Sequence, residues 1–285
     1  MATERTRKTP APVPASSLSP KDVRKVLELL KGAKSIEMKL TVPMTKHQTT
    51  ALGLGLDPVE AQPRQVYFFD TPEFALNRAG LIVRARRIQG GRADTVVKLR
   101  PVDPAMIDAE LKRSDSFKVE VDVMPDGYFA CSASYKGVAT GQEVLDVVAG
   151  TKPIRSLFSK EQRTFYDAHA PAGIGMNSLI ALGPILLLRA KYAPKDFPRG
   201  ITVELWLWPD GKHVLEISTK AMPSEAFQVG MEFKAYLADN GVDLGAVQET
   251  KTRAAMEYFK EKLKVVRRAR KPKAGKAAKT ADAAT

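Results

Sequence analysis

Cysteine is nearly absent from this chain, and Cys131 is the single one among its 285 residues. One cysteine excludes a disulfide within the chain and leaves no cysteine cluster for a metal ion. Histidine is also rare, and the three histidines, His47, His169 and His213, have no metal-ligand spacing. A chain that does not depend on disulfides fits a reducing compartment, so we expect a cytoplasmic location.

Long apolar runs are missing as well. The longest, from Leu179 to Leu188, contains Gly183 and Pro184, and it is far shorter than the roughly 20 apolar residues that a membrane-spanning helix needs. The N-terminus also lacks the apolar core of a secretion signal. Phosphate-binding loops, dinucleotide-binding fingerprints and serine-nucleophile elbows are absent from the sequence. We therefore predict no membrane span and none of these nucleotide- or ester-processing sites.

The net charge of +13 is unevenly distributed along the chain. Residues 264–285 contain eight Lys or Arg and one Asp without apolar periodicity, which predicts a disordered basic tail over 265–285. Such a tail could make weak contact with nucleic acid, or it could simply be solvated. Residues 1–18 contain several Pro and Ser and predict a second flexible end. The remaining residues, 19–264, are predicted to form one domain.

Strand patterns dominate that domain, with helices near its ends. The segments with strand character are residues 34–42, 65–70, 80–88, 94–100, 115–123, 160–169, 184–192, 201–208 and 212–220. Helical patterns follow Pro20 and cover 45–54, 141–149, the stretch between Ser224 and Asn240, and 245–264. Turn sequences such as Gly90-Gly91 and Asp210-Gly211 separate neighbouring strands, as in β-hairpins. Consecutive strands that end in helices predict an α+β fold rather than a wound parallel sheet.

Basic residues recur two apart on several of these strands. Arg84 and Arg86 form one such pair, and Lys98 and Arg100 form another. Side chains two apart on a strand share one face, so each strand presents paired cations on one side. Two explanations are open at this stage. An antiparallel sheet with one face in water shows the same alternation, whereas a closed barrel could turn the cations inward to form a polyanion site.

Several segments, in their order along residues 34–220, resemble the CYTH or triphosphate tunnel metalloenzyme superfamily. The matching segments are Ser35-Ile36-Glu37-Met38-Lys39, Tyr67-Phe68-Phe69-Asp70-Thr71-Pro72, Ile82-Val83-Arg84-Ala85-Arg86, Lys98, Lys118-Val119-Glu120-Val121-Asp122, Arg163 and Glu216-Ile217-Ser218. Ser35 and Ser218 depart from the family pattern, which places acids at both positions. The resemblance implies an eight-stranded antiparallel β-barrel with flanking helices and a basic tunnel.

The resemblance also implies roles for individual residues. The phosphate-binding cations would be Lys39, Arg84, Arg86, Lys98, Arg100, Arg163, Arg189 and Lys191. The carboxylates that would hold Mg²⁺ or Mn²⁺ are Glu37, Glu120, Glu204 and Glu216. Among these residues, Glu37, Lys39 and Glu216 would be catalytic. Because Ser35 and Ser218 remove two acids, metal affinity is expected to fall.

The implied function is a metal-dependent phosphohydrolase acting on a triphosphate-containing small molecule such as tripolyphosphate or ATP. Two alternatives remain from the sequence. A class IV-like adenylate cyclase would make cyclic AMP from ATP in the same tunnel. A polyphosphate- or nucleotide-binding module would bind the same ligands without turnover.

Overall fold

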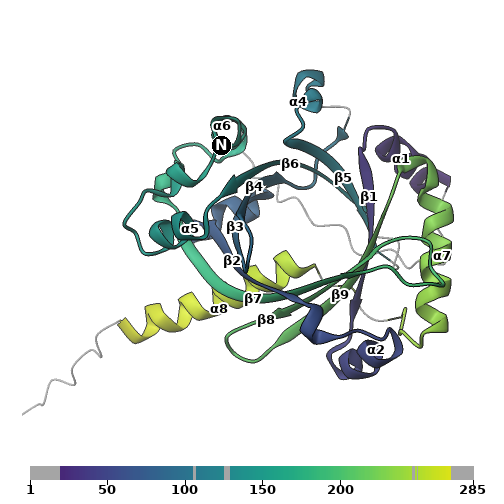
Figure 1. Ribbon diagram of the computed structural model, residues 1–285. Helices are drawn as coiled ribbons and strands as arrows, with labels where there is room; N and C mark the ends of the chain where they lie inside the picture. The colour runs from purple at the N-terminus through teal and green to yellow at the C-terminus, as the bar shows by residue number, and fades with distance from the viewer. Residues whose placement is uncertain (1–19, 105–106, 125–128, 246–247, 249, 271–285) are drawn as a thin grey trace, which may run out of the picture.

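Nine strands in the described part of the chain form a closed barrel, flanked by helices (Figure 1). The computed structural model describes residues 20–104, 107–124, 129–245, 248 and 250–270. The strands are β1 (Ser35–Val42), β2 (Gln62–Asp70), β3 (Leu81–Ile88), β4 (Ala93–Leu99), β5 (Phe117–Val123), β6 (Phe129–Ala139), β7 (Ile180–Tyr192), β8 (Ile201–Leu207) and β9 (His213–Ala221). Their order around the barrel is β1-β5-β6-β4-β3-β2-β7-β8-β9.

The helices connect and cover these strands. They are α1 (Pro20–Lys31), α2 (His47–Gly53), α3 (Ala75–Arg78), α4 (Ala109–Arg113), α5 (Gly141–Val148), α6 (Lys160–His169), α7 (Ala226–Asp239) and α8 (Lys251–Arg270). Short 3₁₀ turns lie at Met44–Lys46, Pro58–Glu60, Ile154–Leu157, Met176–Ser178 and Pro223–Glu225. None of the helices in the described ranges has the length and apolar composition needed to cross a membrane.

The predicted α+β class and closed barrel are confirmed, with a correction to the strand arrangement. The barrel has nine strands instead of eight, and β1 pairs in parallel with β5 while the other neighbouring pairs are antiparallel. The reason is geometric. Strand directions can alternate all the way around a closed ring only if the number of strands is even, so nine strands require a parallel pair.

The outward faces of the strands form the main hydrophobic core beneath the helices. On β1, Ile36 and Leu40 point outward and belong to the same buried cluster as Val229 and Phe233 of α7. Elsewhere α5 packs on β3, and α6 packs on β4 and β6. Because successive strand residues alternate between faces, the charged positions of β1, β3 and β4 point into the barrel. Of the two explanations for the paired cations, the structure supports the closed barrel with its charged faces inward and not a sheet with its charged face in water.

A second hydrophobic cluster lies inside the barrel, where α8 contacts the inner faces of β2, β7 and β8. Ala255, Met256 and Phe259 of α8 pack with inward residues that include Phe68 and Trp206. Figure 1 shows α8, in yellow, crossing next to β7 and β8. The interior thus has an apolar part covered by α8 and a charged part that remains open as a cavity.

Residues 160–169, predicted as a strand, form helix α6. Ser159 caps this helix, because its hydroxyl accepts a hydrogen bond from the Gln162 backbone N–H while the Gln162 side chain bonds back to the Ser159 backbone, the reciprocal capping-box arrangement. The sixth strand is instead β6, which the sequence pattern did not predict. Its Ala-, Ser- and Gly-containing sequence has weak strand propensity, and pairing with β4 and β5 supplies the stability.

Helix α8 continues to Arg270, so it extends beyond the predicted domain end at residue 264. Residues 1–18 and the rest of the predicted basic tail, from 271 onward, lie outside the described residues. The proposed nucleic-acid contact of that tail stays a prediction.

Truncation of Phe259 is expected to destabilise the protein more than truncation of an exposed residue on the same helix. Phe259 is buried in the inner cluster, whereas Val265 is 62% exposed. We expect Phe259→Ala to lower the free energy of unfolding by about 3 kcal/mol, because it leaves a cavity against the strands. Val265→Ala should change it by less than about 0.5 kcal/mol. Urea unfolding of both variants tests this, and equal effects would contradict the docking of α8 inside the barrel.

Candidate active site

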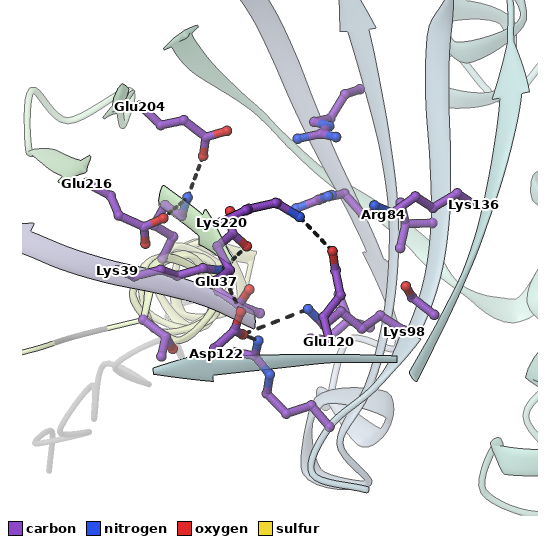
Figure 2. A pocket seen from close by; sticks show the side chains of 18 of the residues that line it. Glu37, Lys39, Arg84, Lys98, Glu120, Asp122, Lys136, Glu204, Glu216 and Lys220 are labelled. Atoms are coloured by element: carbon purple, nitrogen blue, oxygen red, sulfur yellow. Dashed lines mark hydrogen bonds and ion pairs between the residues drawn. The ribbon is translucent and has the colours of Figure 1, made fainter. Parts of the chain in front are cut away.

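The charged part of the barrel interior encloses a cavity of about 190 Å³ (Figure 2). Nine cationic and five acidic side chains line it. The cations are Lys39, Arg84, Arg86, Lys98, Arg100, Lys136, Arg189, Lys220 and Lys251. The acids are Glu37, Glu120, Asp122, Glu204 and Glu216. This lining carries more formal positive than negative charge, so it favours an anionic ligand.

Three of the cations form a wall on the neighbouring strands β3, β4 and β6, and we call Arg84, Lys98 and Lys136 the cation wall. Arg84 and Lys136 flank Val96 in the strand register, and Lys98 lies two residues further along β4 on the same face. Within the described residues, neither Arg84 nor Lys136 forms an ion pair. Lys98 has only a long contact of 4.0 Å from its Nζ to Asp122 Oδ2.

Burial lowers the pKa values of all three cations of the wall, against the effect of nearby acids. Burial, together with the charge of Arg86, lowers the pKa of Arg84 to about 10. Burial and the charges of Arg100 and Lys39 place the pKa of Lys98 well below its ordinary value. The pKa of Lys136 is also lowered, with burial as the main cause. A bound anion would reverse these shifts, because a nearby negative charge favours the protonated form.

Paired charges occupy the side of the cavity formed by β1, β5 and β9. The Lys39 Nζ lies 3.0 Å from Glu37 Oε2 and 3.0 Å from Asp122 Oδ1. Across the β1–β5 seam, Lys220 of β9 contacts Glu120 at 2.7 Å. Burial opposes ionisation of Glu37, but the charges of Lys39, Lys220 and other lysines outweigh it and lower its pKa to about 2. Burial likewise opposes ionisation of Glu120, but Lys136 and Lys220 lower its pKa, so Glu37 and Glu120 are ionised and neutralised by neighbouring side chains.

A third group lies where α8 meets β8 and β9. Glu204 and Glu216 are directly opposite each other in the strand register, where two like charges would repel. The Lys251 ammonium of α8 lies between them, forming ion pairs with Glu204 and, at 2.6 Å, with Glu216. Arg189 contacts the other Glu204 oxygen at 3.2 Å. Figure 2 shows the Glu204 and Glu216 carboxylates on the same side of the cavity, where Lys251 pairs with both.

The four carboxylates expected to hold a divalent metal all line the cavity, but their arrangement does not fit one. Glu37, Glu120, Glu204 and Glu216 are each bound by a lysine at 3.0 Å or less. Among the described residues, no group of three or more His, Cys, Asp or Glu side chains is placed to hold a metal ion. Magnesium requires oxygen ligands gathered around one point, whereas these oxygens are gathered around ammonium groups.

The structure brings most of the predicted site residues to this cavity and leaves out two. Arg163 lies on α6, where its guanidinium donates a hydrogen bond to the Phe158 carbonyl at 3.1 Å. Because the segment is a helix on the outside of the barrel, the expected inward strand position does not exist. Lys191 is exposed near the end of β7 and does not line the cavity. The remaining predicted residues all line it.

Sequence reasoning left four charged cavity residues out of the predicted site, namely Asp122, Lys136, Lys220 and Lys251. Strand alternation places Asp122 with Glu120, and Lys220 with Glu216, so this signal was present for both. Lys136 lies on the unpredicted strand β6. Lys251 lies on a helix that enters the barrel, and no local pattern in the sequence indicates that placement.

Comparisons with known proteins give matches at the level of structure. No family model and no curated protein matches the sequence. The structure resembles HpAC1 from Hippeastrum, a proposed adenylyl cyclase described as having a dominant triphosphatase activity. The two share 16% identity at a TM-score of 0.57, over 78% of this chain and 95% of that one.

A proposed adenylate cyclase from Bacillus halodurans is also similar. It shares 13% identity at a TM-score of 0.54, over 78% of this chain and 97% of that one. Both matches extend over nearly the whole of the other protein. Together with the closed barrel and its charged interior, they show that this chain has the CYTH-like triphosphate tunnel fold.

Proposed function

We propose that the tunnel binds the triphosphate group of a small molecule and hydrolyses one of its phosphoanhydride bonds. The observation that carries this proposal is the cation wall of Arg84, Lys98 and Lys136. Arg84 and Lys98 are partly buried and Lys136 is exposed. Among the described residues Arg84 and Lys136 form no ion pair, and Lys98 reaches Asp122 only at 4.0 Å, although other carboxylates line the same cavity. Weakly paired cations that share a cavity wall repel one another, and a polyphosphate would supply the compensating negative charge.

The chemistry of phosphoryl transfer is compatible with this lining. The reaction depends mainly on positioning and on stabilising negative charge on the phosphoryl oxygens. Arg84 and Arg86 on β3 offer planar donor groups suited to phosphate, and Lys98 and Lys136 add compact charges. Glu37 and Glu120, whose pKa values are lowered against the effect of burial by neighbouring lysines, are acceptors available to orient an attacking water. The triphosphatase activity described for the similar Hippeastrum protein supports hydrolysis at the level of the fold.

Product analysis tests the reaction. The purified full-length chain is incubated with tripolyphosphate or ATP, in EDTA and with added Mg²⁺ or Mn²⁺, and every product is identified. We expect orthophosphate. Cyclic AMP with pyrophosphate would overturn hydrolysis in favour of the cyclase alternative. Tight binding without any product would leave the tunnel as a binding module.

Removal of one cation-wall side chain should weaken binding selectively. We expect Arg84→Ala to raise the Kd for tripolyphosphate about tenfold to a hundredfold, the range for losing hydrogen bonds to a charged group. Arg163→Ala is the matched control, because Arg163 lies outside the cavity, and it should leave the Kd unchanged. Isothermal titration calorimetry measures both. Equal weakening by the two substitutions would contradict the assignment of the tunnel as the binding site.

Binding should also be coupled to proton uptake through Lys98. Its pKa is lowered by burial and by the neighbouring cations Arg100 and Lys39, and a bound polyanion raises it. At a pH between the pKa of Lys98 in the free protein and its higher pKa in the complex, the complex holds more protons than the free protein. The affinity for the polyanion therefore falls as the pH rises through this range. Titrations in buffers of different ionisation enthalpy measure this uptake. Lys98→Met should reduce it, and uptake that is the same in both proteins would assign the proton to another group.

A further inference from the structure

The position between Glu204 and Glu216 is occupied by a side chain from outside the barrel wall. These two carboxylates face each other across neighbouring strands, and both are buried. Lys251, the first residue of α8, ion-pairs with both of them, and its side chain is only 15% exposed. Without this ammonium, two adjacent buried carboxylates would form an attractive site for a divalent cation.

Contacts on both sides of Lys251 fix the position of its ammonium. On the N-terminal side, the Gln248 side chain accepts a hydrogen bond from the Thr41 backbone N–H at 2.8 Å and donates one to the Thr41 carbonyl at 3.3 Å. On the C-terminal side, Met256 and Phe259 pack inside the barrel. The tertiary structure therefore fixes the position of the ammonium, unlike that of a flexible lysine on the surface.

The surroundings of Glu204 are also built for this cation. Its Oε1 contacts Arg189, and its Oε2 accepts a hydrogen bond from the Trp206 indole N–H at 3.2 Å in addition to binding Lys251. The Trp206 ring lies under the same ammonium, with its centroid 5.3 Å from Nζ, within the range of a cation–π contact. Arg189 and the Trp206 indole N–H therefore hold the Glu204 carboxylate in place, and the Trp206 ring adds a contact to the Lys251 ammonium.

We propose that Lys251 is the resident cation of the tunnel, occupying the position of a divalent metal between Glu204 and Glu216, so that the tunnel binds polyphosphate without Mg²⁺ or Mn²⁺. A lysine ammonium has three donors. Two of them are directed to the carboxylates, and the third is available to a phosphate oxygen, since Lys251 also lines the cavity. It thereby bridges protein carboxylates and ligand phosphate, as magnesium does in other proteins. The polyphosphate part of this inference rests on the proposed function.

Metal binding alone tests the central claim, without any substrate. The wild-type full-length chain is titrated with Mn²⁺ and followed by electron paramagnetic resonance. We expect no stoichiometric binding at millimolar Mn²⁺. Lys251→Ala should create a site for one Mn²⁺, and Lys251→Ala combined with Glu216→Gln should remove it again. Lys264→Ala, on an exposed part of the same helix, is the matched control and should behave as wild type.

Stoichiometric Mn²⁺ binding by the wild type that is not strengthened in Lys251→Ala would overturn the proposal. Thermal unfolding checks that each variant is folded, and Mn²⁺ should raise the melting temperature of Lys251→Ala only. If that variant does not fold, Lys251→Gln replaces it, and the wild-type titration decides independently. Lys251→Arg keeps the positive charge and should still exclude Mn²⁺.

Tripolyphosphate binding separates this inference from the proposed function. Wild type should bind tripolyphosphate in EDTA, and Lys251→Ala should bind about tenfold more weakly in EDTA and regain affinity with Mg²⁺. If tripolyphosphate binding by the wild type requires Mg²⁺ or Mn²⁺, the assignment of Lys251 as the resident cation is wrong, while the proposed function still holds. The absence of tripolyphosphate binding under all conditions would overturn the proposed function, and the Mn²⁺ titration would still decide the role of Lys251 as the cation between the carboxylates.

Discussion

Charge pairing inside a closed barrel is the constraint on which this structure depends. A barrel of this kind must bury its inward-facing side chains, and ionised groups are costly to bury unless they have partners. On β1 and β5 the chain meets this requirement within the protein, because Lys39 binds both Glu37 and Asp122. On β3, β4 and β6 it does so only in part. Arg86 pairs with Asp94 at 2.8 Å, but Arg84 and Lys136 are left without ion pairs among the described residues. This asymmetry leaves the described lining of the interior with an excess of positive charge.

Helix α8 links the stability of the barrel to the composition of the site. Its apolar residues cover the inner faces of β2, β7 and β8, which would otherwise expose Phe68 and Trp206 to the interior. The same docking delivers Lys251 to Glu204 and Glu216. The helix is thus part of the site as well as part of the core. A change in its docking would alter both the free energy of unfolding and the charge of the cavity.

The parts of the fold that the sequence predicted are those in which a local pattern decides the structure. Strand alternation correctly placed Arg84 and Arg86 on one inward face of β3, because a strand has a fixed period of two. The same signal failed at residues 160–169. There a capping box at Ser159 and the i, i+3, i+4 spacing of the buried residues Gln162, Phe165 and Tyr166 produce α6. It also missed β6, where pairing with two neighbours outweighs weak local propensity.

The amino-acid sequence by itself determined the α+β class, most of the strands, and the identity of the cations on their charged faces. It did so because hydrophobic periodicity and charge spacing are local properties of the chain. Tertiary structure decided which way the charged faces point, and which charges neutralise each other. The pairing of Lys251 with Glu204 joins residues 47 apart, and the contact of Gln248 with Thr41 joins residues 207 apart. Such contacts form only when the barrel closes around α8, since closure alone brings these distant segments within bonding distance.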